Sequence, residues 1–412
     1  MPWGYWLPIL GVWTAFLFSL WLAMFGMISL FRKQWTEHER LSYPLLQVPV
    51  AFVEGREGER PFWLNPYAWG GFLTACFYNA LNIANAFNPQ VLAPGKFFDL
   101  GALFTERPLV GLRPLILWYR PAIIGLGYFI PLDICASAVV FFLVEKLVNV
   151  GAVAVGAEIP GFPYMREQSL GTFLALFGFY VWVGRRHLRR MLLAALGLKR
   201  VDTSREPMHL RTALLFIVGG LAFCLWWYWE AGMSPWLAGL YLFLVLSVAV
   251  VYARIRAEAG VPLIWMFSWY QHKRFIVNLL GSRRLVRGGD LSDPTMLSAT
   301  VFLSRGYYSS MMAYQLESMK LGEDSRADPR ATAAIVVLSC LIGWGVAYWV
   351  HLTAYYEWGA RPLSFRKIWG GGAGQGGIQG GGFLPGQSQA SRPFKDLRRR
   401  GGVYDRAWAL PP

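Results

Sequence analysis

Long uncharged runs constrain this chain more than any other feature of its sequence. The stretch SPWLAGLYLFLVLSVAVV, residues 234–251, contains no charged residue. A helix needs about 20 apolar residues to cross a bilayer. The clearest runs of that kind are 6–31, 122–144, 210–229, 234–253 and 332–352, and weaker candidates lie at 66–87 and 169–184. We therefore predict an all-α, polytopic transmembrane helical bundle with about seven spans.

The composition excludes an ordinary soluble domain. Of the 412 residues, 55% are hydrophobic and 15% are charged, whereas soluble domains carry about 25% charged residues. The first apolar run begins almost at Met1, without the basic segment and small-residue cleavage site of a signal peptide. We expect an N-terminally incomplete copy of a longer, transporter-like chain.

Motifs for cofactors, metals and nucleophilic catalysis do not occur in the sequence. The four cysteines lie inside apolar runs without a Cys-x-x-Cys pair, and the five histidines show no metal-ligand spacing. No P-loop, GxSxG or dinucleotide-binding fingerprint is found. We expect no cofactor, no metal site, no nucleic-acid partner and no enzymatic activity.

Basic residues mark the segments that we expect on the cytoplasmic side. Residues 32–60, 185–211 and 254–287 are rich in Arg and Lys, whereas the turn EAGM at 230–233 has none. Short basic loops prefer the cytoplasm, so the three segments should share the cytoplasmic side of the membrane.

The segment 66–87 is the best candidate for a re-entrant or interfacial piece. Three apolar segments separate the first two basic loops, although an even number is needed to return to the same side. Asn79, Asn82 and Asn85 lie along one face of this segment. They could bond to a neighbouring helix or form the polar lining of a cavity.

Asp133 is the clearest example of an isolated charged residue within an apolar run. It lies at the centre of 122–144, two residues after Pro131, which cannot donate a backbone hydrogen bond. A carboxylate beside an opened helix favours a cation or proton site. The alternative is an Asp paired with a neighbouring polar side chain in a packed bundle.

The run that ends at VVYARIRAEAGVP predicts a broken helix. Arg254 and Glu258 are four residues apart and can pair, whereas Arg256 points toward another segment or an anionic group. Gly260 and Pro262 should end the helix, and a short apolar piece follows. Such a break indicates a transporter binding site, although a basic anchor at a helix end is the simpler explanation of the arginines.

Three further segments are not expected to span. Residues 306–330 have helical apolar spacing, with Glu317 and Lys320 placed to pair, and should lie on the bundle surface. Residues 89–121 have the Pro and Gly content of an external flap. Residues 361–412 form a Gly-rich basic tail that we expect to be disordered, which leaves 1–360 as the transmembrane domain.

Four motifs in order carry a family resemblance: FRKQWTEHERLSYPLLQVPV, GYFIPLDICAS, RIRAEAGVP and AYQLESMKLG. Over about residues 1–360 the chain resembles a family of uncharacterised bacterial membrane proteins, distantly similar to the oligopeptide transporter superfamily. That resemblance implies proton-coupled secondary transport of small peptides or metal chelates through a helical bundle.

The leading hypothesis is therefore a secondary transporter in the bilayer, with a small-molecule solute as partner. Its pathway would combine Asp133, Arg254, Arg256 and Glu258 with the asparagine face. One alternative is a structural or partner-binding membrane subunit. Another is an integral-membrane enzyme such as a lipid-linked glycosyltransferase. Oligomerisation is compatible with each of these.

Overall fold

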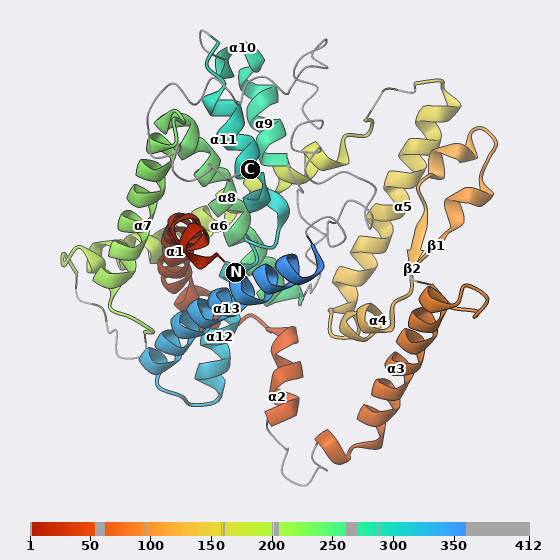
Figure 1. Cartoon of the computed structure of the whole chain (residues 1–412), viewed down its shortest axis with the longest axis horizontal. Coiled ribbons are helices and arrows are strands. Elements are labelled where there is room, and N and C mark those ends of the chain that lie inside the picture. Colours follow the sequence, from red (N-terminus) through yellow and green to blue (C-terminus); the bar gives the residue numbers. More distant parts are fainter. Residues whose placement is uncertain are drawn as a thin grey trace.

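The computed structural model describes residues 2–53, 62–95, 97–157, 159, 161–199, 201, 206–260, 271–286 and 289–359. The predicted tail at 361–412 and the apolar piece after Gly260 lie outside these residues. The described chain is mostly helical and divides into a bundle and a projecting lobe (Figure 1).

The bundle contains most of the helices. They are α1 (Trp3–Lys33), α2 (Gln47–Val53), α6 (Met165–Ala195), α7 (Leu210–Glu230), α8 (Pro235–Ala259), α9 (Gln271–Leu280), α10 (Ser282–Leu285), α11 (Ser292–Ala299), α12 (Met311–Asp324) and α13 (Pro329–Trp358). A π-helix, Gln34–His38, continues α1, and a 3-10 helix, η7 (Val301–Arg305), lies between α11 and α12.

Five of the described helices are long and apolar enough to cross a membrane: α1 with its extension, α5 (Leu132–Ala154), α7, α8 and α13. Each corresponds to one of the five clear apolar runs. The total of about seven is not confirmed, because the weaker runs form α3 (Pro66–Phe87) and α6, which do not meet the same criterion.

Small residues let α1 and α7 pack closely. A Cβ atom added to Gly220 would overlap the carbonyl oxygen of Ser19, and one added to Gly26 would overlap that of Ala213. In a bilayer, burying apolar surface between helices contributes little to their association, and close backbone contact at glycine is a common alternative. On the N-terminal side of this contact in α1, the ring of Phe16 stacks on that of Trp227, with 4.3 Å between the ring centroids.

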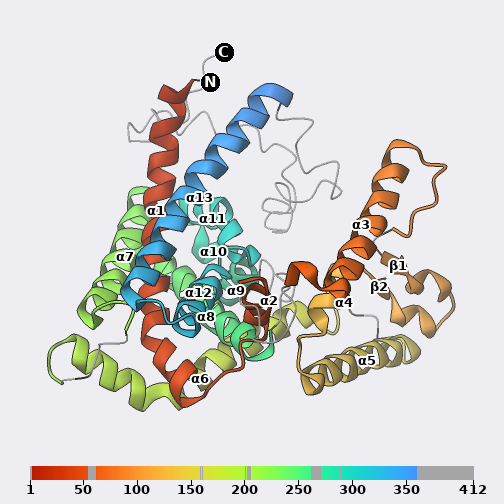
Figure 2. The same ribbon diagram turned by 90° about the horizontal axis from the view of Figure 1, so that it is seen from below.

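Helix α8 forms the centre of the bundle. Most of its residues from Leu237 to Ala259 are buried, with α6, α7, α9 and α12 packed around it. A helix that is apolar on every side is expected in such a place. Helix α1 packs against both α7 and α12, and Figure 2 shows α7 and α13 toward the outside of the bundle.

The lobe contains α3, α4 (Pro121–Gly127), α5 and a two-stranded antiparallel sheet, β1 (Phe97–Asp99) with β2 (Ile116–Trp118). This short sheet, with strands of three residues each, lies in the segment predicted as a flap; the described chain is otherwise helical, in agreement with the predicted helical fold. The backbone of Gly111 approaches Asn149 so closely that a Cβ would lie 2.8 Å from its carbonyl oxygen. Lys146 Nζ donates to the carbonyl of Pro114 at 2.9 Å, and these contacts attach the loop to α5.

Candidate functional site

The end of α8 carries a network of charged side chains, some of them buried. The helix ends at Ala259, and Gly260 caps it with φ of 64°. A side chain at Gly260 would be strained there, and its Cβ would lie 2.8 Å from Pro44. The predicted end of the helix is confirmed.

Backbone bonds attach the loop after α1 to this helix end. The amide of Tyr43 donates to the carbonyl of Ala257 at 2.8 Å. The hydroxyl of Ser42 donates to the carbonyl of Glu258 at 2.9 Å. Burial raises the pKa of the Tyr43 phenol well above its usual range, although the nearby Arg32 guanidinium opposes the shift. The two hydrogen bonds from the loop therefore satisfy backbone carbonyls at the end of α8 that have no partner within the helix.

Arg254 joins α8 to the segment after α1. Its Nε donates to Glu258 Oε2 at 3.1 Å, which confirms the predicted pair. Its Nη1 pairs with Glu39. The guanidinium also lies over the rings of Trp35 and Tyr180, at 5.7 and 5.3 Å from their centroids. Cation–π contacts and ion pairs therefore both fix the position of the Arg254 side chain.

Arg256 has a different partner, as predicted. Its Nε lies 2.6 Å from Glu317 Oε1 on α12, and its guanidinium lies 4.3 Å from the ring centroid of Tyr314. Both charged side chains are about one tenth exposed. The expected pairing of Glu317 with Lys320 is wrong, because Lys320 pairs with Asp324 on the solvent side of α12. The helix is also more buried than a surface-lying one, since its apolar face packs on α8 and α1.

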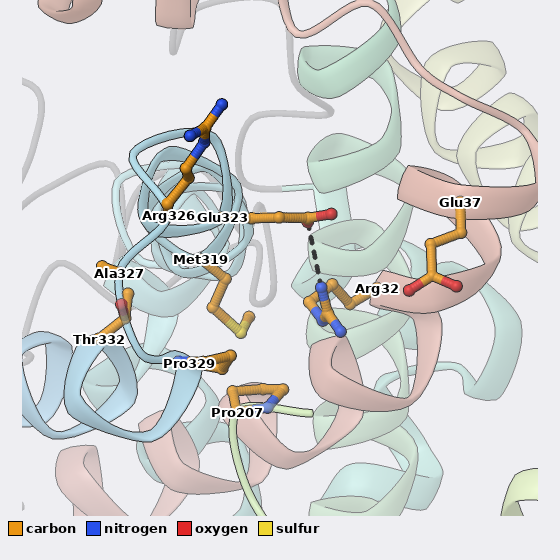
Figure 3. Close-up of a pocket in the computed structure, with 9 residues that line it drawn as sticks. All are labelled: Arg32, Glu37, Pro207, Met319, Glu323, Arg326, Ala327, Pro329 and Thr332. Atoms are coloured by element: carbon orange, nitrogen blue, oxygen red, sulfur yellow. Dashed lines mark hydrogen bonds and ion pairs between the residues drawn. The ribbon is translucent and has the colours of Figure 1, made fainter. Parts of the chain in front are cut away.

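Arg32 extends the network to α12 and to the chain entering α7. It lies 3.2 Å from Glu206 and 3.2 Å from Glu323. Beside it is a cavity of about 400 Å³, lined by Arg32, Glu37, Pro207, Met319, Glu323, Arg326, Ala327, Pro329 and Thr332. Figure 3 shows Arg32 and Glu323 joined as an ion pair among the side chains that line the cavity. Three segments predicted to share a membrane side thus meet at one end of the bundle, and which side this is stays a prediction.

A second polar feature lies deep in the bundle, where a helical segment, residues 292–324, is interrupted. Residues 292–324 follow α8 in the same direction, first as α11, then as η7 and a turn at 306–310, and finally as α12. At one end, Asp293 accepts bonds from the amide and hydroxyl of Ser234. At the other end, Glu317 meets Arg256. The stretch of α8 between Ser234 and Arg256 is about 33 Å long.

The interruption is rich in buried hydroxyl groups. Thr300, Ser304, Ser309 and Ser310 are all at most 2% exposed. Tyr241 of α8 donates its hydroxyl to the carbonyl of Thr300 at 2.8 Å. The hydroxyl of Tyr308 donates to the Leu17 carbonyl in the middle of α1. Non-helical backbone at membrane depth is tolerated where protein surrounds it or where it lines a polar cavity.

The structure does not bring Asp133 to the arginines. Asp133 is exposed in the first turn of α5, because the helix begins only at Leu132. Its predicted place at the centre of a spanning helix is therefore wrong. Figures 1 and 2 both place α5 apart from α8, and among the described residues no ion pair joins Asp133 to Arg254 or Arg256.

The asparagine face belongs to the same lobe. Asn79 and Asn82 donate to the carbonyls of Ala75 and Tyr78 at 2.8 Å. Asn82 also accepts from the amide of Gly95 at 3.1 Å, and Asn85 donates to Val91 at 2.7 Å. The bonds of Asn82 and Asn85 to Gly95 and Val91 fold the loop after α3 back onto its helix, whereas the bond of Asn79 stays within α3.

A family of unknown function, DUF6785, matches residues 1–375. The chain belongs to the DUF6785 family. Its matched part includes the charged network and the interrupted element. No curated protein and no solved structure matches the chain. In the described part of the chain, no group of three or more His, Cys, Asp or Glu side chains is placed to bind a metal ion.

Sequence reasoning missed several members of both features. Glu39, Glu206 and Glu323 lie in polar segments where a single Glu is unremarkable, and Arg32 looks like an ordinary basic residue at a helix end. A signal did exist for the interruption. The stretch ATVFLSRGYYSSMMAY combines small hydroxyl residues, aromatics and a glycine, and it contains only one charge.

Proposed function

We propose that this chain is a secondary transporter for a small solute in a bacterial cytoplasmic membrane. One observation carries the proposal: an interrupted helical element lies buried along the most apolar helix of the bundle, over about the thickness of a hydrocarbon core. Apart from its ends, the element has few charges and many hydroxyl groups. Such interruptions supply polar groups for a solute where a continuous helix has none to offer.

The charged network is the proposed gate. Its ion pairs join the segment after α1, the end of α8 and α12 on one end of the bundle. A solute that moves past this end must separate some of these pairs. Breaking a buried ion pair costs free energy. The closed form is therefore stable until binding of the solute or the coupling ion offsets that cost.

The solute class follows from the resemblance to oligopeptide transporters, which implies small peptides or metal chelates moved with protons. The cavity beside Arg32 supports a solute with both charges, because cationic and anionic side chains line it together. Of the predicted pathway residues, Arg254, Arg256 and Glu258 belong to this proposal. Asp133 and the three asparagines do not, because they lie in the lobe.

The test is uptake by the purified chain in liposomes. An inward proton gradient or an inward Na⁺ gradient is imposed, and accumulation of labelled dipeptides, tripeptides and ferric chelates is compared with protein-free liposomes. We expect gradient-dependent accumulation of at least one solute class. Equal accumulation in both kinds of liposome across the panel would refute the proposal.

A reversible lock tests the gate directly. The hydroxyl of Ser42 lies 2.9 Å from the backbone carbonyl of Glu258, which makes these two positions a suitable cysteine pair. Ser42→Cys with Glu258→Cys, in a background without the native cysteines, is expected to form a disulfide under oxidation. Uptake should stop on oxidation and return with a reductant. Each single-cysteine variant is the matched control, and transport that continues in the oxidised double variant contradicts the gate.

The subunit alternative has one observation in its favour. Helix α3 has no buried residue and α5 has only Lys146, so much of the lobe's apolar surface is open to lipid or to another protein. If the lobe binds a partner subunit, the chain alone should fail to transport and should regain uptake when co-purified from native membranes with that subunit.

A further inference from the structure

Three buried oxygen atoms belong to the surroundings of the interruption of the α11–α12 element, residues 292–324. Ser309 Oγ in the turn and Gln315 Oε1 on α12 have no hydrogen-bond partner among the described residues, and the hydroxyl of Tyr228 on α7 interacts with the side chain of Thr300. Each of the three side chains is at most 2% exposed. Leaving a buried polar atom without a partner is unfavourable, and two such atoms on one short stretch of chain need a physical reason.

Tyr228, Gln315 and the neighbour of Ser309 contact the same short stretch of α1. The ring of Tyr228 lies 5.3 Å from that of Phe16. Tyr308, next to Ser309, bonds the carbonyl of Leu17. One turn further along α1, Gln315 Nε2 donates to the carbonyl of Trp21 at 3.1 Å. The side-chain amide is therefore oriented by its nitrogen, and the oxygen is left available.

The chemistry of these oxygens selects the kind of ligand. An amide oxygen can only accept hydrogen bonds or coordinate a cation, so an anion does not fit Gln315. The backbone adds the C-terminal end of α11, whose carbonyls carry partial negative charge. Residues 306–316 contain no charged side chain, which suits a monovalent ion better than a divalent one. The nearest cation in sequence, Arg305, is partly exposed and lies over the Tyr307 ring at 5.4 Å.

We propose that the interruption between α11 and α12 binds a small monovalent cation, Na⁺, through Ser309, Gln315 and Tyr228 together with backbone carbonyls. The interruption lies about 22 Å from the charged network, counted along α8 from Tyr241 to Arg256. The inference rests on the proposed function in one respect: it makes Na⁺ the coupling ion in place of the proton that the family resemblance implies. Binding itself is measured without transport.

The experiment compares the unfolding temperature of the detergent-purified full chain in NaCl and in choline chloride at equal ionic strength. A ligand that binds only the folded state stabilises it, so we expect NaCl to raise Tm by about 2–4 °C. Ser309→Ala removes an oxygen that bonds nothing else in the described structure, so it should fold normally and lose most of the rise. Gln315→Leu should do the same, although it also removes the bond to Trp21.

Ser29→Ala is the matched control, since Ser29 is a buried hydroxyl of α1 that donates to its own helix at Phe25. It should keep the full response to NaCl. Equal Tm in the two salts, as expected if water alone occupies the site, would overturn the inference. So would an unchanged rise in Ser309→Ala. A chain that responds to NaCl but transports nothing would instead count against the proposed transport function.

Discussion

The pair formed by Arg256 and Glu317 offers a quantitative test of the charged network. Its two atoms lie 2.6 Å apart, and the side chains are 9% and 11% exposed. Removing one partner of a buried pair costs about 3–5 kcal/mol, because the other charge is stranded. Since both side chains keep some access to water, we expect about 3 kcal/mol, near the lower end of this range.

Arg256→Met and Glu317→Met should each lower Tm by roughly 6 °C, at about 2 °C for each kcal/mol. The double variant removes both charges and replaces them with apolar groups of similar length. It should therefore recover most of the loss, as happens when a buried ion pair is replaced by packed side chains. The measurement is thermal unfolding in detergent at one fixed scan rate, since membrane proteins often unfold irreversibly.

The matched control lies on the same helix. Lys320 and Asp324 also lie 2.6 Å apart, but their side chains are 22% and 44% exposed. Asp324→Asn should change stability by less than about 1 kcal/mol, because exposed pairs contribute little. If Arg256→Met has an effect as small as this control, or if the losses of the two single variants simply add in the double variant, the reasoning about the buried pair is wrong.

Three further predictions address packing, pH and orientation. Gly220→Ala should destabilise the chain by about 1–3 kcal/mol, because the new methyl group overlaps the backbone of α1, whereas Gly219→Ala, with open space around it, should be neutral in the same unfolding assay. Burial lowers the pKa of His272 to about 4; between pH 6.5 and 4 the unfolded chain therefore binds more protons than the folded chain, and Tm should decrease as the pH is lowered, more steeply than in His272→Gln. In a background without native cysteines, Lys199→Cys should resist a membrane-impermeant thiol reagent added outside cells, whereas Glu230→Cys should react; the opposite pattern would reverse the orientation.

The sequence predicted the spanning helices well, because a bilayer imposes a length that can be counted. Each of the five clear runs became one of the five helices able to span, although the run at 122–144 was displaced. Pro131 explains the displacement: it is the N-cap residue directly before α5 and does not loosen the helix, since its missing amide is harmless at a helix start. Asp133 therefore lies at a helix start and not at a helix centre.

Local charge spacing was also informative. Arg254 and Glu258 pair because they are one helical turn apart, and Gly260 ends the helix because it takes a positive φ at no cost. The sequence also indicated that Arg256 faces elsewhere. It could not indicate Glu317, because the partner is 61 residues away and only the packing of α12 on α8 brings it near.

By itself, the sequence determined which segments are apolar enough to span, where α8 ends, and which charges on one helix share a face. These properties depend on neighbours within a few residues. The tertiary structure decided which distant groups meet: Arg32 with Glu206 and Glu323, Arg254 with Glu39, and the interrupted α11–α12 element with α1 and α8. It also separated Asp133 and the asparagine face from the arginines. Pairing across a bundle depends on how whole helices pack, and hydropathy is the same for any arrangement of those helices.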